Sequence, residues 1–420
     1  MEGAVRELNG VAGRVDGDRL WRRLMQMAEI GAIPGNGVNR QALSEEDIAA
    51  RELLIDWARK RGYGVAVDDA ANLFVRRPGS EPDLAPVLTG SHMDSQPRGG
   101  RFDGIYGVMA GLEALDALED SGTATRRPVE LVAWTNEEGS RFDPGCMGSM
   151  VFSGAAPLER FEDAVDGNGI SFGRALSRTL GAAPDLPRRR EPVPPAAYIE
   201  AHIEQGPVLE AAEVPIGAVT GVQGSQRFVV EVAGATAHAG TTPVNNRRDA
   251  LQAAMRAVAR LNETMADPND VLRFTVGRFE VEPNSPNTVP SRVTFSIDLR
   301  HPDGWELDRR ARRIARVCEN AARPCSVRIS RTFDQRPVSF EPGIVELIER
   351  SAAAVDLPTQ RIPSGANHDA AFVAKVCPTA MIFIPCFRGV SHHESEYASP
   401  EDCAAGAQVL AETLCALADS

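Results

Sequence analysis

Several short segments of the sequence place a histidine or a carboxylate in turn-like surroundings. His92 stands two residues before Asp94, and Asp103 is followed directly by Gly104. His202 lies further along, in the run Glu-Ala-His-Ile-Glu-Gln-Gly. Imidazole nitrogens and carboxylate oxygens are ligands for divalent metal ions, so these residue types indicate metal-dependent chemistry.

A hydrolytic centre with two metal ions has requirements that such residues can meet. One carboxylate must be shared by the ions, other side chains must hold each ion, and water must become acidic enough to attack at neutral pH. The candidate ligands are His92, Asp103, Glu138, His202 and a histidine near position 392. Glu137 precedes Glu138, and neighbouring side chains point in different directions, so one glutamate can bind metal while the other moves protons.

Each motif also has an ordinary structural explanation when it is taken alone. A His-x-Asp triplet is a simple hydrogen-bonded turn in roughly two cases out of three, and an adjacent pair of glutamates is a solvated loop in roughly four out of five. The joint occurrence of the motifs is what predicts a dinuclear site. In that site we expect the Asp94 carboxylate to accept the second ring proton of His92 and so orient the ring.

Two buried strands and a helix are expected to position the first ligands. Residues 86–90 form an apolar run typical of a strand, residues 105–118 have the apolar spacing of a helix, and residues 129–135 indicate a second strand. This order favours an α/β unit with a parallel or mixed sheet, in which functional residues gather at the carboxyl ends of strands. His92 and the two glutamates occupy such ends.

The pattern changes near residue 217. Strands are predicted at 227–232, 272–281, 291–299 and 326–331, and helices at 249–263 and 305–321. The order β-α-β-β-α-β is the ferredoxin-like signature. We therefore predict an α/β catalytic domain with a mixed central sheet, formed by residues 1–216 and 332–420, and an inserted ferredoxin-like α+β domain at 217–331.

The catalytic domain is expected to resume with a helix at 343–355. Before the inserted domain, residues 182–195 are rich in Pro and Arg and are expected to form an exposed loop.

Composition excludes several classes of protein. The formal net charge of −13 disfavours nonspecific binding to nucleic acid or to an anionic membrane. No apolar run approaches the roughly 20 residues of a membrane helix, and Met1 to Ile30 lack the features of a signal peptide. The seven cysteines include no Cys-x-x-Cys pair, so they are expected to be reduced and mostly buried. We expect a cytoplasmic protein.

Read in order, the motifs resemble those of the dinuclear metallopeptidase and amidase superfamily. Within it, the chain is similar to the N-carbamoyl-L-amino acid hydrolases and allantoate amidohydrolases of the hydantoinase/carbamoylase family. The segments that carry the resemblance are Gly90–Pro97, Gly99–Gly104, Thr135–Phe142, Glu200–Pro207, Ala237–Pro243, Asn287–Pro290 and Ser391–His392.

The resemblance implies a role for each candidate ligand. Asp103 would bridge two divalent ions, with His92 and His202 on one ion and Glu138 and His392 on the other. Zinc, manganese, cobalt and nickel all suit such ligands, and we favour zinc or manganese. His393 would be the spare member of the doubled histidine.

The resemblance also implies the catalytic and substrate-binding residues. Glu137 would be the general base. The inserted domain would be a lid and the interface of a homodimer, from which His238 would reach into the partner subunit's site to stabilise the oxyanion. Asn287 and Arg300 would bind the substrate carboxylate, which the planar guanidinium suits. The other residues implied to contact the substrate are Gln205, Gly365 and His368.

One residue departs from the family pattern. Asn367 stands where the family usually shows glycine, within the run Ser-Gly-Ala-Asn-His-Asp. The backbone beside a substrate-facing loop is therefore expected to differ there.

The implied reaction is hydrolysis of the ureido C–N bond of an N-carbamoyl-L-amino acid. Allantoate and β-ureidopropionate also present a ureido group beside a carboxylate, so amidohydrolases for these substrates remain alternatives. A peptidase of the same superfamily is a further enzyme hypothesis. A metal-depleted binding protein is a hypothesis of another class, and it predicts the loss of a ligand or of the base, all of which are present.

Overall fold

The computed structural model describes residues 10–189 and 194–419, which form two compact units. The first unit comprises the chain up to Gly221 together with Ser339–Ser420, and the second comprises Val222–Val338. Parts of two expectations, the exposed loop at 182–195 and the segment Met1 to Ile30, lie outside the described residues.

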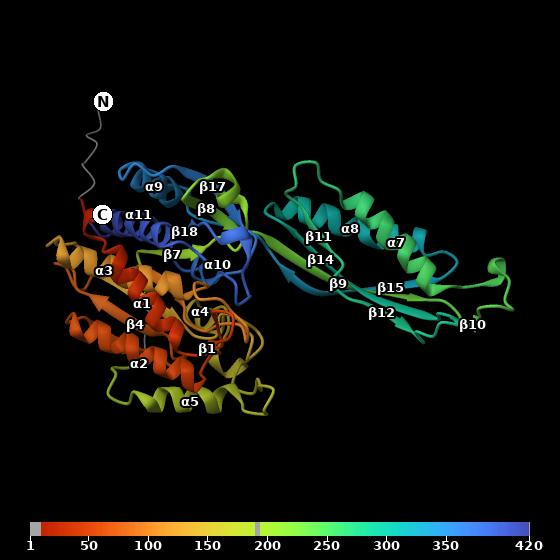
Figure 1. The fold of residues 1–420 in the computed structure, drawn as a ribbon, viewed down its shortest axis with the longest axis horizontal. Coiled ribbons are helices and arrows are strands. Elements are labelled where there is room, and N and C mark those ends of the chain that lie inside the picture. The colour runs from red at the N-terminus through yellow and green to blue at the C-terminus, as the bar shows by residue number, and fades with distance from the viewer. Residues whose placement is uncertain (1–9, 190–193, 420) are drawn as a thin grey trace. The chain divides into compact units, whose positions relative to one another are not determined.

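The first unit is built on a large mixed sheet (Figure 1). Its strands are β3 (Gly64–Val67), β4 (Leu73–Arg77), β5 (Val87–His92), β6 (Val129–Trp134), β7 (Ala197–Ile203), β8 (Ile216–Val222), β16 (Val338–Ser339), β17 (Thr359–Ser364) and β18 (Thr379–Ile384). They follow the order β16-β8-β18-β7-β5-β6-β4-β3, and β17 pairs with β8. The central strands β18, β7, β5 and β6 run parallel, whereas β8, β4 and β3 are antiparallel to their neighbours. The α/β class with a mixed sheet is therefore confirmed.

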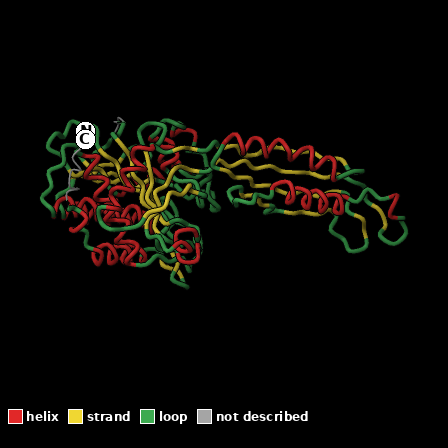
Figure 2. The backbone as a smooth tube through the Cα atoms, turned by 90° about the horizontal axis from the view of Figure 1, so that it is seen from above, coloured by secondary structure: helices red, strands yellow, loops and turns green. Residues whose placement is uncertain are grey.

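Helices surround this sheet, as the tube in Figure 2 shows. They are α1 (Gly17–Glu29), α2 (Glu45–Lys60), α3 (Ile105–Asp120), α4 (Met147–Phe152), α5 (Phe172–Ala182), α6 (Val208–Ala212), α9 (Pro342–Ala353), α10 (Ala370–Val373) and α11 (Pro400–Ala418). Short 3-10 turns lie at Ala12–Arg14, Leu158–Arg160 and Phe387–Gly389, and a small hairpin joins β1 (Ala32–Ile33) to β2 (Gly37–Val38).

The core of the first unit lies between the central strands and α3. Every residue of β5, β6 and β7 is buried, as expected for parallel strands covered on both faces. α3 is buried from Ile105 to Leu118 and packs on these strands together with α11. The predicted strands and helix thus exist, and the rigid core fixes where each central strand ends.

The second unit contains a five-stranded antiparallel sheet and two helices. Its elements are β9 (Gly224–Ala233), β10 (Ala237–His238), α7 (Ala250–Met265), β11 (Arg273–Thr275), β12 (Phe279–Glu282), β13 (Thr288–Val289), β14 (Arg292–His301), α8 (Gly304–Ala321) and β15 (Ser326–Gln335), with a 3-10 turn at Val244–Asn246. Four of its strands follow the order β11-β14-β9-β15, and β12 pairs with β14. Alternate residues of β9 and β14 pack with α7 and α8 into a core of their own.

The prediction of one continuous strand at 272–281 is wrong. The expected strand at 272–281 is divided into β11 and β12, both paired with β14. Thr275 pairs with Asp298, and Phe279 pairs with Phe295. The segment between β11 and β12 therefore has one residue more than the facing part of β14. The extra residue lies beside Gly277, and glycine in a strand commonly marks such a bulge.

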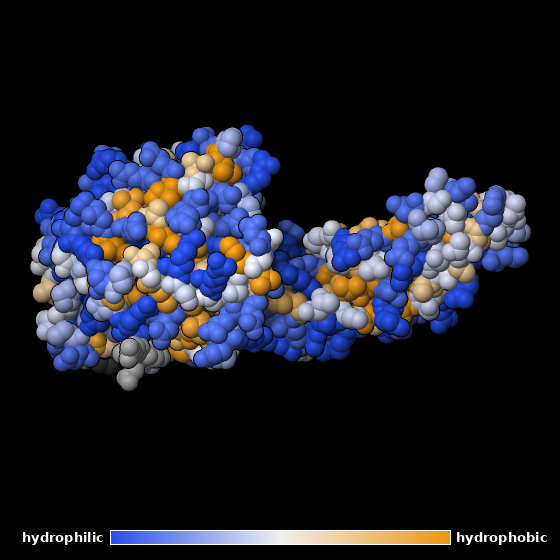
Figure 3. All heavy atoms as spheres, turned by 90° about the horizontal axis from the view of Figure 1, so that it is seen from below, coloured by the Kyte–Doolittle hydropathy of each residue, from blue (hydrophilic) through white to orange (hydrophobic). Residues whose placement is uncertain are grey.

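The surface in Figure 3 is mostly hydrophilic on both units, with apolar residues in separate patches. Scattered apolar residues of this kind are normal on water-exposed proteins. In the described part of the chain, no helix combines the length and apolar character needed to cross a membrane.

Candidate metal centre

The candidate ligands come from separate segments at the carboxyl edge of the large sheet. His92 is the last residue of β5, His202 lies near the end of β7, and Glu138 follows β6. Asp103 lies two residues before the start of α3, and His392 lies in the loop before α11. The parallel strands therefore bring together residues that are up to 300 positions apart in the sequence.

Three of these side chains form a buried group. The Oδ1 atom of Asp103 lies 3.2 Å from Nε2 of His202 and 3.7 Å from Nε2 of His92. The ligand atoms of the three residues all lie within 4.8 Å of one another. This triad is suited to one metal ion.

A second group uses the other oxygen of the same aspartate. The Oδ2 atom of Asp103 lies 3.2 Å from Nε2 of His392, which in turn lies 3.4 Å from Oε2 of Glu138. Both histidines are exposed, but His393 places Nδ1 against the hydroxyl of Ser395, at 2.8 Å, rather than against Asp103. Of the doubled histidine, the structure therefore brings His392 to Asp103.

Each oxygen of the Asp103 carboxylate faces a different triad. This arrangement fits two divalent ions with Asp103 between them. The donor set is imidazole nitrogen and carboxylate oxygen throughout, which matches zinc, manganese, cobalt or nickel. Like charges are also crowded here, and burial together with the neighbouring Asp103 raises the pKa of Glu138 to about 8. Divalent cations would relieve that repulsion.

The two buried histidines already present the correct nitrogen. Nδ1 of His202 donates to the carbonyl oxygen of Ile203 at 2.8 Å, and Nδ1 of His92 donates to the carbonyl oxygen of Asp94 at 2.9 Å. A histidine that donates from Nδ1 leaves a lone pair on Nε2. Both rings therefore face Asp103 with the nitrogen that could bind a metal ion.

This geometry corrects the expected role of Asp94. Its carboxylate lies 3.8 Å from Nδ1 of His92, too far for a hydrogen bond. The main-chain carbonyl of the same residue orients the ring instead. The carboxylate accepts the backbone N–H groups of Glu137 and Glu138, each at 3.2 Å, and burial with the nearby Asp47 raises the pKa of Asp94 to about 7.

Gly104 permits the close approach of the Asp103 loop to His92. Its φ is +68°, and a Cβ atom there would lie 2.3 Å from the imidazole ring of His92. Any L side chain would therefore be strained and would displace the ring.

The backbone after β6 turns sharply to present the two glutamates. Asn136 has a φ of +55°, a conformation that asparagine tolerates, and its amide donates to the carbonyl oxygens of Phe142 and Pro144. Glu138 then accepts hydrogen bonds from the backbone N–H and side-chain amide of Gln96.

Glu137 lies on the other side of this turn. Its Oε2 atom is 3.5 Å from Nε2 of His92, and its Oε1 atom is 3.5 Å from the thiol of Cys146. Burial and the carboxylates of Asp369 and Glu138 raise the pKa of Glu137 well above its ordinary value. A carboxylate with a raised pKa beside the ligands has the properties of a general base.

The departure at Asn367 has a structural counterpart. The Nδ2 atom of Asn367 donates to Sγ of Cys146 at 3.4 Å, and that thiol faces Glu137. The contact joins the loop after β17 to the residue beside the ligands. Sequence reasoning had no signal for Cys146, since it belongs to no motif.

Other polar residues support Asp103. The Nε2 atom of Gln205 donates to Oδ2 of Asp103 at 2.9 Å, so this predicted substrate contact lies on the bridging carboxylate. The hydroxyl of Ser391 lies 3.2 Å from the same oxygen. Glu396, which the sequence did not single out, accepts the backbone N–H of Asp103 at 3.0 Å.

The loop after β17 holds two further predicted residues. His368 is buried, its Nε2 lies 2.8 Å from the Ser364 hydroxyl, and its ring centroid lies 4.6 Å from that of His202. Gly365 lies in the same loop. Glu200, His202 and His368 form another possible ligand group, but it competes with the first triad because His202 has only Nε2 available.

The remaining predicted residues belong to the second unit. Nδ1 of His238 accepts the N–H groups of Gly240 and Thr241, so its Nε2 carries the proton and can donate outward. Asn287 is exposed in the loop before β13. Arg300 lies on the open face of the sheet and forks onto Asp298, with Nε and Oδ1 2.8 Å apart.

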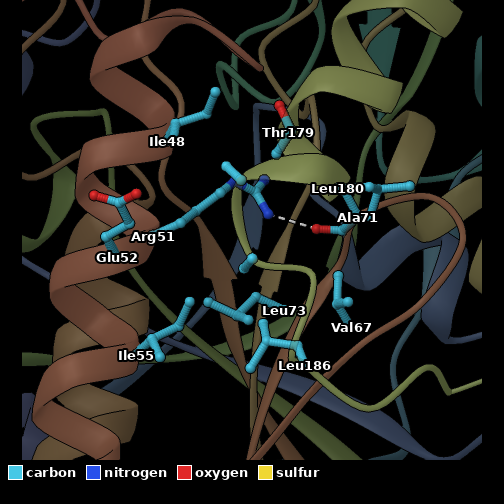
Figure 4. Close-up of a pocket in the computed structure, with 12 residues that line it drawn as sticks. Ile48, Arg51, Glu52, Ile55, Val67, Ala71, Leu73, Thr179, Leu180 and Leu186 are labelled. Atoms are coloured by element: carbon cyan, nitrogen blue, oxygen red, sulfur yellow. Dashed lines mark hydrogen bonds between the residues drawn. The ribbon is translucent and has the colours of Figure 1, made fainter.

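A separate apolar cavity lies between α2, β4 and α5 (Figure 4). Apolar side chains line most of it, and none of the candidate ligands does. Arg51 crosses the cavity to the carbonyl oxygen of Ala71 and also bonds Asp47 and the hydroxyl of Thr135. This arginine is therefore satisfied within the fold, and the metal centre is the stronger candidate site.

Comparison with known proteins agrees with this geometry. Residues 88–416 match the model of peptidase family M20/M25/M40. The N-carbamoyl-L-amino-acid amidohydrolase of Rhizobium meliloti is 41% identical over 404 residues, covering 94% of this chain and 95% of the relative. The allantoate amidohydrolase of Escherichia coli (strain K12) is 35% identical over 401 residues, covering 93% and 96%. The crystal structure of an amidase of the hydantoinase/carbamoylase family from Burkholderia multivorans has a TM-score of 0.90 and 45% identity, covering 97% and 98%.

Proposed function

Since this chain belongs to peptidase family M20/M25/M40 and is an amidohydrolase like its relatives, we propose that it converts an N-carbamoyl-L-amino acid to the amino acid, carbon dioxide and ammonia. The membership confirms the resemblance that the motifs predicted. The single observation that carries the proposal is the division of the two Asp103 oxygens between two ligand triads beside Glu137.

Two divalent ions, when bound, polarise the ureido carbonyl and acidify water. His92, Asp103 and His202 would hold one ion, and Asp103, Glu138 and His392 the other. Among the chain's own groups, Glu137 takes a proton from the attacking water and returns it to the leaving nitrogen.

The proposed reaction forms one bond at the ureido carbon and breaks another. A new C–O bond forms to the ureido carbon, the bond from that carbon to the α-nitrogen breaks, and the proton held by Glu137 moves to that nitrogen. The carbamate that is released decomposes to carbon dioxide and ammonia. Asp94 fixes the backbone of both glutamates, so Glu137 remains aimed at the water position.

Recognition of the substrate is proposed to involve the inserted unit, Val222–Val338, for which we propose the roles of lid and dimer interface. Asn287 and Arg300 would bind the carboxylate, and His238 of the partner subunit would donate from Nε2 to the oxyanion. The protonation state of His238 supports this role, because its Nδ1 is already an acceptor. Gln205, Gly365 and His368 would line the substrate side.

We further propose zinc or manganese as the native ions and the cytoplasm as the compartment. Seven free, buried cysteines suit a reducing environment.

A panel of substrates tests the proposed reaction. The protein is freed of metal with a chelator and reconstituted with Mn²⁺ or Zn²⁺, and ammonia release is measured. The panel contains N-carbamoyl-L- and D-amino acids, allantoate, β-ureidopropionate and dipeptides. Metal-dependent turnover of the L-carbamoyl compounds is expected, while preference for allantoate would support the second candidate, which the relative from Escherichia coli favours. No bound ion and no turnover of any compound would refute the enzyme proposal.

A further inference from the structure

Glu396 is a buried carboxylate beside the metal centre that is not one of its ligands. Its exposed fraction is 4%, and its Oε1 atom accepts the backbone N–H groups of Phe102 and Asp103, both at 3.0 Å. Its Oε2 atom accepts the hydroxyl of Ser391 at 2.8 Å. All three partners belong to segments that carry ligands.

These contacts connect two loops that are far apart in the sequence. Residues 100–104 carry Asp103, and residues 391–396 carry His392. Ser391 lies between the two carboxylates, because its hydroxyl is also 3.2 Å from Oδ2 of Asp103. A change in Glu396 would therefore reach both loops.

Gly100 lies directly against the Glu396 carboxylate. A Cβ atom on Gly100 would lie 2.1 Å from Oε1 of Glu396, so only glycine allows the carboxylate to reach the N–H groups. The backbone of Asp103 is thus held closely at the point where its side chain must serve two triads.

We propose that Glu396 is a positioning residue of the dinuclear centre, which fixes the backbone of Asp103 so that each of its oxygens faces one triad. The inference rests on the proposed function, since it requires that the triads bind metal. Without Glu396, two buried N–H groups lose their acceptor, and the Asp103 carboxylate is free to turn toward one triad alone.

The affinity of Glu396 variants for Mn²⁺ tests this positioning role, and the measurement needs no substrate. Glu396→Ala is expected to weaken Mn²⁺ binding by about tenfold to 100-fold, the range found for residues that support metal ligands. Glu396→Asp should show the same loss, because the shorter side chain withdraws the acceptor while keeping the charge. Glu396→Gln should stay within about threefold of the wild type, because its amide oxygen can still accept both N–H groups.

Glu412 supplies the matched control. It is 2% exposed in α11, and its Oε1 atom accepts the backbone N–H of Ala12 at 2.8 Å. Glu412→Ala should lower the melting temperature while leaving Mn²⁺ affinity unchanged, which separates loss of stability from loss of positioning.

The affinities are measured by chelator competition on the full chain with Mn²⁺ alone. Wild-type affinity for two ions in folded Glu396→Ala or Glu396→Asp would overturn the inference and leave the proposed function intact. If the wild-type protein itself binds no ion, both the inference and the proposed function fail.

Discussion

Glu137 and Glu138 are neighbours in the sequence, but their carboxylates have different surroundings. Glu138 accepts two hydrogen bonds from Gln96 and lies 3.4 Å from His392. Glu137 is close to the thiol of Cys146 and to His92. The first arrangement fits a metal ligand, and the second leaves a carboxylate available to move protons.

Exchange of Glu137 for glutamine tests this division of roles. Glu137→Gln should lower kcat by about 100-fold or more, because general acid–base catalysis commonly contributes that much. Metal content, measured by elemental analysis, should stay at the wild-type level. A variant that has lost its metal would show that the two glutamates have the opposite roles.

The doubled histidine offers a paired test of the second triad. His392→Ala should remove Nε2 from Asp103 and Glu138 and reduce bound metal by one ion per chain. His393→Ala removes exposed contacts to Ser395 and Glu394, so its metal content and kcat should stay within about twofold of the wild type. The same metal loss in both variants would contradict the assignment.

Sequence patterns identified residue types better than they identified contacts. The His-x-Asp triplet correctly drew attention to His92, but the acceptor is the Asp94 carbonyl, because that choice depends on the local turn geometry. Glu396 escaped notice because its acceptor role depends on backbone N–H groups almost 300 positions away. Such tertiary contacts leave no periodic signal in the sequence.

At the scale of elements, β5 and β6 were predictable because each contains apolar residues that favour a buried strand, and both strands are buried throughout. The break between β11 and β12 was not predictable, since the residues on both sides have strand character and only the pairing with β14 reveals the extra residue. The ladder register is a property of two strands, whereas the sequence pattern describes one.

Arg40 joins two of these elements. Its buried guanidinium donates to the carbonyl oxygens of Met27 and Ile30 at the end of α1, and to that of Met93 just after β5. Because Met93 follows His92, this contact ties a helix end to a ligand-bearing strand end.

Removal of that guanidinium should therefore destabilise the fold. Arg40→Met leaves three carbonyl groups without this donor, and we expect the free energy of unfolding to fall by about 3 kcal/mol or more. Urea denaturation measures the change. Arg98→Met, at a side chain that is 75% exposed, is the control and should change the free energy by less than about 0.5 kcal/mol. Equal effects would contradict a specific role for Arg40.

At the scale of the whole molecule, stability without metal should depend on pH. Contact with Asp103 raises the pKa of His392 to about 9. Burial lowers the pKa of His202, but its contact with Asp103 outweighs that effect and raises the pKa to about 9. Burial and Asp103 raise the pKa of Glu138 to about 8. The folded protein thus binds more protons than the unfolded chain, so stability falls as pH rises. His92, whose pKa burial lowers to about 4, opposes this trend only below its ordinary value of 6.5.

The melting temperature of the metal-free protein should therefore fall between about pH 6.5 and 9. Added Mn²⁺ should raise it more at pH 8.5 than at pH 6.5, since ions bind the deprotonated ligands. Differential scanning calorimetry with and without the ion measures both effects. A metal-free melting temperature that rises over this interval would contradict the prediction.

The proposed homodimer can be tested by mixing two inactive variants. Glu137→Gln lacks the base and His238→Ala lacks the group offered to the partner subunit. After equal amounts are dissociated and reassembled, half of the dimers are mixed and one of their two sites is intact, so about a quarter of wild-type activity should return. Activity that stays at the level of the separate variants would show that His238 does not act across subunits.

The spread of the ligands from His92 to His392 has a consequence for biosynthesis. Chains are made from the N-terminus and fold as they emerge, and the last ligand belongs to the final segment before α11. A nascent or prematurely ended chain can hold at most the triad of His92, Asp103 and His202. If hydrolysis needs both proposed ions, it can begin only after His392 has been synthesised, and products that end before His392 should be inactive.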